Sequence, residues 1–137
     1  MFRRHQSSLA QVYSIAGLPG RELDALEGLV TPITLQAGEV FKSQGRVGTD
    51  AHLLLAGELI VERDGEPGAV WSPGASGGEQ AVLLNEPRNA TVTAATDAVV
   101  AVMSRREFAS MLQRCPSLGR EVLHAAVERA AAPMTER

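Results

Sequence analysis

The sequence has few residues of the kinds that build cross-links, metal centres or membrane spans. Its single cysteine, Cys115, excludes a disulfide framework, a cysteine-based zinc site and a redox pair, and we expect it to be a buried structural residue. The three histidines, His5, His52 and His124, are scattered and lack the close spacing of metal ligands. No run reaches the roughly 18 apolar residues of a membrane span, so none is expected.

The composition is that of an ordinary globular chain. With 137 residues, 45% of them apolar, one domain over residues 1–137 can bury a core without metal or disulfides. The formal net charge of −3 gives no general attraction for nucleic acid or an anionic membrane, so an anion site must be built locally. Arg3 and Arg4 precede polar residues rather than the apolar core of a signal peptide, so we expect a cytoplasmic protein.

A helical lead-in is expected over residues 7–30. Apolar residues recur at helical spacing in two stretches, about 7–16 and about 21–30, and Pro32 would end the second helix. Glycine and proline between the two stretches break the pattern, so they are read as separate helices.

Short strands and glycine turns follow over residues 31–103. A turn recurs about every 8–12 residues, which is typical of a β-barrel or a sandwich. The dipeptide Asp64-Gly65 is a strong hairpin signal. The expected strands cover residues 34–36, 40–43, 52–56, 58–62, 69–71, 90–94 and 98–102.

C-terminal helices are expected over residues 104–132. Ser104 and Glu107 have the spacing of a capping box, which opens a helix that ends near Cys115. A last helix would begin at Ser117, and its apolar stripe consists of Leu118, Val122, Leu123, Ala126, Val127 and Ala130. This stripe either packs on the strands of its own chain or pairs with a second copy in a homodimer.

The segment from Gly74 to Thr91 carries the chemistry. It holds three glycines, the acid Glu79 after two of them, a short apolar run, and Arg88 after a proline. A carboxylate accepts from hydroxyls, a guanidinium binds phosphate through two parallel donors, and free backbone amides favour an anion. The combination suits a phosphorylated sugar.

Several motifs together resemble the cyclic-nucleotide-binding domain of catabolite activator proteins, kinase A regulatory subunits and gated channels. They cover most of the chain from Ile15 to Arg129, and the most specific is the phosphate-binding cassette from Gly78 to Thr91. The others are Leu35-x-x-Gly38-Glu-Val-x-x-x-x-Gly45, Leu53-Leu-Leu-x-x-Gly57-Glu-Leu-x-Val, and the ending Phe108, Pro116 and helix. The resemblance implies an α+β fold: a jelly-roll-like β-barrel, cupin-like, with N-terminal helices, a short phosphate-binding helix and C-terminal helices.

The resemblance also implies the roles of seven residues. Arg88 would bind the phosphate and Glu79 the ribose 2′-hydroxyl, with cyclic AMP favoured over cyclic GMP by family frequency. The remaining ligand-binding residues would be Gly78, Gln80, Ala81, Asn89 and Ala90. Outside this context, Arg88 reads as a surface salt bridge to Glu86 or Glu79, and Glu79 as a solvated loop acid.

The chain departs from the family pattern at three places. Ala75-Ser76-Gly77 stands where an acid and two aromatic residues are usual, Gln80 replaces an apolar residue, and Asn89 replaces a small one. Asn89 would donate to the phosphate or to a guanine edge, or would crowd the site. His124 is the one ring on the last helix that could cover the base, with an exposed polar role as the alternative.

These observations favour a stand-alone sensor or regulatory module in which the ligand repositions the last helix and an effector protein reads the change. The alternative is a degenerate fold that serves as a protein-interaction module without ligand. Catalysis is not expected, since a cupin-type enzyme needs clustered histidine and acid ligands. DNA binding by this chain alone is not expected either, because too few residues follow Pro133 for a helix-turn-helix.

Overall fold

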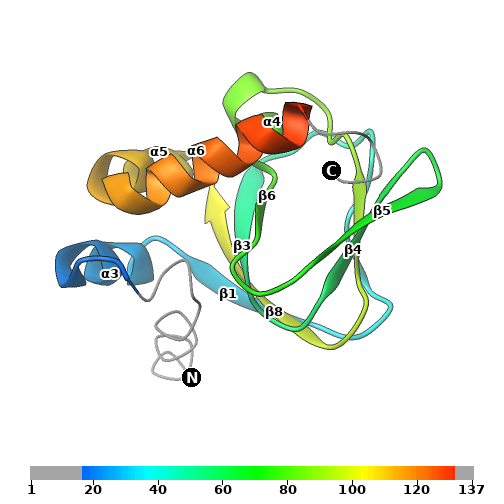
Figure 1. The fold of residues 1–137 in the computed structure, drawn as a ribbon, viewed down its shortest axis with the longest axis horizontal. Helices are drawn as coiled ribbons and strands as arrows, with labels where there is room; N and C mark the ends of the chain where they lie inside the picture. Colours follow the sequence, from blue (N-terminus) through cyan, green and yellow to red (C-terminus); the bar gives the residue numbers. More distant parts are fainter. Residues whose placement is uncertain (1–16, 132–137) are drawn as a thin grey trace.

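The computed structural model describes residues 17–131, in which two antiparallel sheets face each other (Figure 1). One sheet has the strand order β1 (Thr31–Leu35), β8 (Ala98–Ser104), β3 (Asp50–Ala56) and β6 (Ser76–Gly77). The other has the order β2 (Val40–Lys42), β7 (Thr91–Ala94), β4 (Leu59–Arg63) and β5 (Glu66–Trp71). The expected α+β, jelly-roll-like fold is confirmed, as a two-sheet sandwich rather than a closed barrel.

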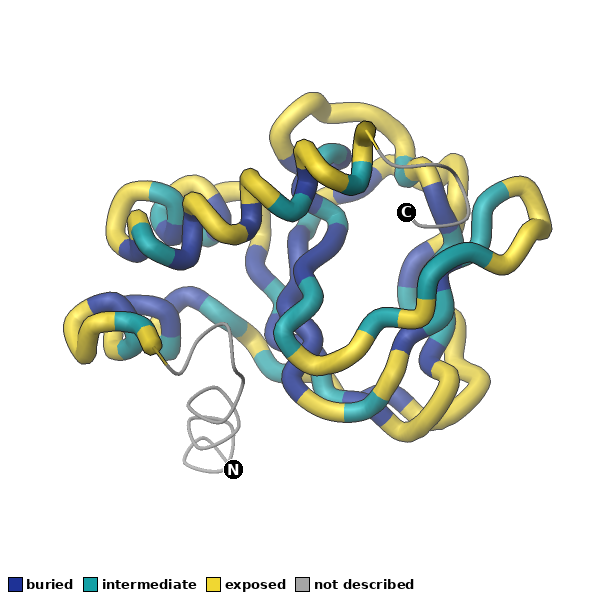
Figure 2. The backbone as a smooth tube through the Cα atoms, viewed as in Figure 1, coloured by how far each residue is buried: buried dark blue, intermediate teal, exposed yellow. Residues whose placement is uncertain are grey.

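The central strand β3 separates two hydrophobic clusters. Successive side chains of a strand point to opposite faces, so the run of three leucines in β3 needs apolar surroundings on both sides. Leu54 packs between the sheets, whereas Leu53 and Leu55 pack toward the helices with Phe108 and Met111. In Figure 2 the buried positions gather where helices meet strands and between the two sheets.

Within the described residues, four helices lie around this sandwich: α3 (Gly20–Glu27), α4 (Glu79–Leu84), α5 (Arg105–Arg114) and α6 (Pro116–Ala131). The capping box at the start of α5 is confirmed, because the Ser104 hydroxyl accepts from the Glu107 amide and the Glu107 carboxylate accepts from the Ser104 amide. At the start of α6, the buried Glu22 carboxylate accepts from the Ser117 amide at 3.0 Å and from its hydroxyl at 2.9 Å. This contact ties α3 to α6.

The buried Cys115 thiol is structural, as expected, and donates to the Glu22 carbonyl at 3.3 Å. Burial, followed by the nearby Glu22 carboxylate, raises the pKa of the Cys115 thiol.

The hairpin at Asp64-Gly65 is confirmed, with both residues at positive φ between β4 and β5. Several boundaries were wrong, among them the starts of the strands expected over 34–36 and 69–71, since β1 begins at Thr31 and β5 at Glu66. The helix expected over 21–30 ends at Glu27, and Pro32 lies inside β1 opposite Ala101. Proline has no amide to donate, and β1 is an edge strand, where a missing donor costs no ladder bond.

The sequence patterns also missed β6 and placed the start of the last helix one residue late, since α6 begins at Pro116. Proline fits a first helical turn because the amide there has no intrahelical acceptor. The helix expected over 7–16 lies outside the described residues.

Candidate functional site

The segment from Gly78 to Ala90 crosses from one sheet to the other and carries α4. Gly78 begins it at φ 78°, a left-handed conformation that favours glycine. A Cβ at Gly78 would lie 2.6 Å from Arg88 Nη1 and 2.7 Å from Lys42 Nζ. Glycine therefore lets two cationic side chains lie against the backbone at the start of α4.

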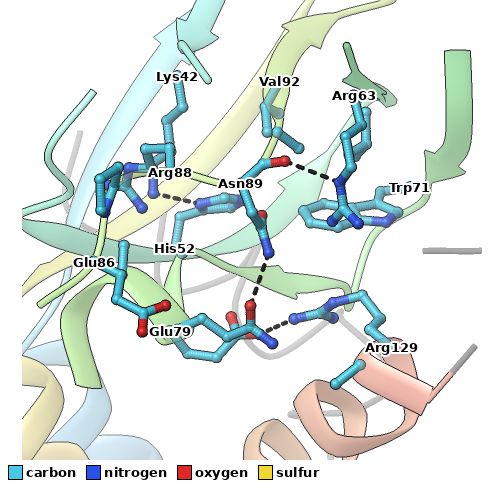
Figure 3. A pocket seen from close by; sticks show the side chains of 17 residues that line it. Lys42, His52, Arg63, Trp71, Glu79, Glu86, Arg88, Asn89, Val92 and Arg129 are labelled. Carbon is cyan, nitrogen blue, oxygen red and sulfur yellow. Dashed lines mark hydrogen bonds and ion pairs between the residues drawn. The ribbon is translucent and has the colours of Figure 1, made fainter. Parts of the chain in front are cut away.

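A cavity of about 250 Å³ opens between this segment, the strands of the second sheet and the end of α6 (Figure 3). Every residue expected to bind a ligand lines it: Gly78, Glu79, Gln80, Ala81, Arg88, Asn89 and Ala90. Side chains that sequence reasoning missed line it as well, among them Lys42, His52, Arg63, Trp71 and Arg129.

Arg88 is held by Asp50 at the N-terminal end of β3. Its Nη2 donates to the Asp50 backbone carbonyl and to Asp50 Oδ1, both at 2.9 Å, and the Arg88 side chain is 9% exposed. The alternative of a surface salt bridge to Glu86 or Glu79 is wrong, since the carboxylate that pairs with Arg88 is that of Asp50. Asp50 thus orients the guanidinium through Nη2, while Nη1 has no hydrogen-bond partner within residues 17–131.

Lys42 is the second cation at the same carboxylate. Its Nζ lies 3.0 Å from Asp50 Oδ1, and the lysine side chain is 6% exposed. Burial, followed by the charge of Arg88, lowers the pKa of Lys42 from 10.5 to about 8, against the opposing effect of Asp50. Two buried cations therefore share one partly exposed acid, leaving one positive charge in excess.

His52 completes the cluster from β3. Its Nδ1 lies 2.8 Å from Lys42 Nζ, and its ring packs edge-on against Phe41 with centroids 5.0 Å apart. Burial, and then the charges of Lys42, Arg88 and Arg129, lower the pKa of His52 well below its usual value, so the ring is neutral at pH 7. An ammonium can only donate, so Nδ1 accepts and the ring hydrogen is on Nε2.

Glu79 lies across the cavity from these cations and is held by the last helix. Arg129 of α6 donates to Glu79 Oε1, and the Glu79 side chain is only 3% exposed. The Arg129 guanidinium also lies over the Trp71 ring, 5.2 Å from its centroid. The reading of Glu79 as a solvated loop acid is therefore wrong, and α6 reaches the cavity through Arg129 rather than through His124.

Asn89 and Gln80 form the side of the cavity nearer solvent. The Asn89 amide donates to Gln80 Oε1 at 2.8 Å, while the Asn89 carbonyl accepts from Arg63 Nε at 2.9 Å. The two residues that depart from the family pattern in this region, Gln80 and Asn89, are thus hydrogen-bonded to each other. His124 is the exposed polar residue of the alternative reading, since its side chain is 74% exposed and pairs with Glu128.

Three buried side-chain atoms have no hydrogen-bond partner within residues 17–131, and all three belong to residues that line this cavity: Arg88 Nη1, Glu79 Oε2 and His52 Nε2. Buried polar groups are almost always paired, because an unpaired one loses its hydration without compensation. A cationic donor, a carboxylate acceptor and a neutral donor therefore remain for a polar anion that also carries a hydroxyl.

No group of three histidine, cysteine, aspartate or glutamate side chains in the described part of the chain is close enough to hold a metal ion. The described helices include none that is both long and apolar enough to cross a membrane.

Residues 32–115 match the family model of the cyclic nucleotide-binding domain. Because this match covers more than half of the 137 residues, the chain belongs to the cyclic nucleotide-binding domain family. A cAMP-dependent protein kinase regulatory subunit of Yarrowia lipolytica is 32% identical over 106 residues, which are 76% of this chain and 28% of that protein. The chain thus spans less than a third of the length of this relative.

Solved structures share the fold at lower identity. The regulatory domain of Toxoplasma gondii PKA with cAMP aligns with a TM-score of 0.76 at 21% identity, over 93% of this chain and 50% of that one. The regulatory subunit of a cAMP-independent protein kinase A from Trypanosoma brucei aligns with a TM-score of 0.76 at 23% identity, over 96% of this chain and 46% of that one. The fold alone therefore does not decide whether cyclic AMP binds.

The buried charge of Lys42 predicts a rise in the stability of the ligand-free protein above pH 8. The pKa of Lys42 is about 8 in the folded protein and near 10.5 in the unfolded chain, so between these values the unfolded chain binds more protons. Raising the pH through this window should stabilise the wild type relative to Lys42→Met by up to about 3 kcal/mol. Urea unfolding from pH 7.5 to 10.5 gives the free energy of unfolding of each protein. Subtracting one from the other cancels the titrations of groups that both proteins share. A constant difference would contradict the assignment.

Proposed function

We propose that this chain binds a cyclic nucleotide as a sensor or regulatory module, with cyclic AMP preferred over cyclic GMP. The observation that carries the proposal is a set of three buried atoms that have no hydrogen-bond partner within residues 17–131 and belong to residues lining one cavity. Two of these residues, Glu79 and Arg88, lie in the segment whose sequence matches the family cassette, and the third, His52, lies on β3. The phosphate would lie beside Arg88 and the ribose 2′-hydroxyl beside Glu79.

The distribution of charge supports the phosphate position. On one side of the cavity, Arg88 and Lys42 share the single carboxylate of Asp50, whereas on the other side Glu79 and Arg129 form a neutral pair. An anion is stabilised where positive charge is in excess and buried, since screening by water is weak there. Nη1 of this guanidinium has no hydrogen-bond partner within residues 17–131, and a planar guanidinium suits phosphate oxygens.

The ribose position is supported by the different contacts of the two carboxylate oxygens of Glu79. Its Oε1 accepts from Arg129, while Oε2 is buried and has no partner within residues 17–131. A hydroxyl donating to Oε2 would satisfy the carboxylate without displacing Arg129. Gln80, Ala81 and Ala90 would line the remaining wall around the sugar and phosphate.

The preference for cyclic AMP rests on the relatives and on Asn89. The Yarrowia lipolytica relative is a cAMP-dependent kinase regulatory subunit. The Asn89 amide, which could otherwise recognise a guanine edge or the phosphate, already donates to Gln80. Trp71, whose ring lies under the Arg129 guanidinium, also lines the cavity, so a base would lie beside this pair.

A ligand on Glu79 would also act on α6. Arg129 is a residue of α6 and joins Glu79 to the Trp71 ring, so a shift of Glu79 on ligand binding would move the end of this helix with it. Repositioning of α6 is therefore the proposed output, a shift between two populations that an effector protein would read.

Isothermal titration with cyclic AMP and cyclic GMP tests the binding directly. We expect saturable heat with both ligands, tighter for cyclic AMP, and a loss of affinity of at least about tenfold in Arg88→Ala. Arg106→Ala, on the exposed face of α5, is the matched control and should bind normally. Thermal unfolding checks that Arg88→Ala is folded, and Arg88→Lys serves if it is not. Absence of heat at millimolar ligand, or binding unchanged in both Arg88 variants, would overturn the proposal.

The ribose contact is tested by comparing cyclic AMP with 2′-deoxy cyclic AMP. Removing the hydroxyl leaves Glu79 Oε2 unpaired, so the deoxy ligand should bind about tenfold or more weakly to the wild type. In Glu79→Ala the two ligands should bind alike. Glu86→Ala, which removes an exposed carboxylate from the same cavity, should keep the difference. Equal affinities for the two ligands in the wild type would exclude this contact.

The second candidate function is a protein-interaction module without ligand. The likeness to a regulatory subunit of a cAMP-independent kinase A favours it, because the same fold occurs there. In addition, Glu79 is already paired with Arg129 in the ligand-free structure, so this carboxylate does not depend on a ligand for a partner. The titrations above separate the two candidates.

We also propose that the outer face of α6 pairs with a second copy of the chain in a homodimer. Leu118, Val122 and Ala126 are buried against their own chain, while Leu123 and Val127 remain 40% and 67% exposed. Light scattering with and without cyclic AMP should detect a dimer in at least one state, and Val127→Glu should dissociate it. A monomer in both states, at concentrations up to the millimolar range, would remove the dimer.

A further inference from the structure

Lys42 is the single lysine of the chain, whose other twelve cationic side chains are arginines. It lies at a buried position that lines the cavity, 8% exposed as a whole residue. An arginine keeps its charge at any pH a protein survives, whereas a buried ammonium can lose its proton. The one lysine of the sequence thus lies where a change of charge would act directly on an anion.

The two cations of the cluster converge on one point of the backbone. A Cβ on Gly78 would come within 2.6 Å of Arg88 Nη1 and 2.7 Å of Lys42 Nζ. Both nitrogen atoms therefore lie against the backbone of Gly78, the residue that precedes α4. His52 keeps the ammonium there, because its Nδ1 accepts from Lys42 at 2.8 Å. The remaining contacts of Nζ are to Asp50, at 3.0 Å to Oδ1 and 3.3 Å to the carbonyl.

We propose that Lys42 is a second cation of the phosphate site, and that the protein takes up a proton on Lys42 when it binds a cyclic nucleotide at alkaline pH. This inference rests on the proposed function and adds a residue and a linkage to it. The cluster of Arg88, Lys42 and Asp50 carries one positive charge in excess, and a phosphodiester carries one negative charge. The bound anion makes the cluster neutral and favours the protonated lysine.

Among the charged and titratable groups around this part of the cavity, Lys42 is the one whose protonation would change when the ligand binds. Asp50 and His52 face it from β3, and Arg88 faces it from the segment before β7. Beyond His52, Arg129 of α6 is paired with Glu79 of α4. Arginine does not titrate in this range, and the pKa of His52 is lowered, so neither exchanges a proton above pH 7.

The direction of the linkage follows from the pKa of Lys42, which is about 8 without ligand. Below this pH the lysine is charged in both states and affinity is independent of pH. Above it, binding requires a proton until the higher pKa of the bound state is reached, so affinity falls by up to about tenfold per pH unit.

A single lysine makes the test direct, because lysine labelled with ¹³C and ¹⁵N gives one side-chain signal from the full chain. We expect this signal to titrate near pH 8 in the free protein and at a clearly higher pH with saturating cyclic AMP. Calorimetry at pH 8.5 in two buffers of different ionisation enthalpy should detect proton uptake with the same ligand.

Two variants separate charge from titration. Lys42→Arg keeps the charge without titrating, so its affinity for cyclic AMP should be independent of pH from 7 to 9.5, with no proton uptake. Lys42→Met should bind about tenfold or more weakly at pH 7 and also lack the pH dependence. Thermal unfolding of both variants without ligand identifies a variant that has lost its fold, and the wild-type measurements stand without them.

Each outcome decides between the two proposals. If the wild type binds cyclic AMP but the Lys42 signal does not move and affinity stays flat from pH 7 to 9.5, this inference is wrong and the proposed function stands. If Lys42 titrates near pH 8 but no cyclic nucleotide binds, the proposed function fails and this inference with it.

Discussion

The pairing of one carboxylate with two buried cations is the interaction on which the rest of the site depends. Asp50, at the start of β3, accepts from Arg88 Nη2 and lies 3.0 Å from Lys42 Nζ. It holds both cations in place without neutralising both, and Nη1 of Arg88, a residue that lines the cavity, has no hydrogen-bond partner among residues 17–131. The cluster thus keeps one positive charge in excess, in a chain whose formal net charge is −3.

The fold brings this charge cluster to one end of the sandwich. β3 lies in the middle of its sheet and is buried on both faces, so Asp50 and His52 are fixed by the same strand that carries the leucine core. Lys42 comes from the facing sheet, and Arg88 from the segment that crosses between the two. The gap between the sheets at this end, covered by α4 and by Arg129 of α6, becomes the cavity.

Local pattern in the sequence predicted the Asp64-Gly65 hairpin and the capping box. The family resemblance predicted the α+β, jelly-roll-like fold, though as a barrel rather than a two-sheet sandwich, and the seven cassette residues that line one cavity. Neither predicted Lys42, His52 or Arg129, whose roles arise from contacts between residues 8 to 50 positions apart. Side chains on a strand alternate between its two faces whether they are apolar or charged, so the position of Lys42 on β2 did not by itself mark it as a site residue. Pro32 was misread because its tolerance in β1 depends on an edge position that only the sheet order defines.

The central claim is that Arg88 Nη1 and Glu79 Oε2, which have no hydrogen-bond partner within residues 17–131, are contacts of a cyclic nucleotide. A crystal structure of the protein grown with cyclic AMP tests it most directly. The account predicts density with the phosphate beside Arg88 Nη1 and the ribose 2′-hydroxyl on Glu79 Oε2, with Arg129 still on Glu79 Oε1. A cavity without ligand density at saturating cyclic AMP, or a phosphate bound away from Arg88, would contradict it.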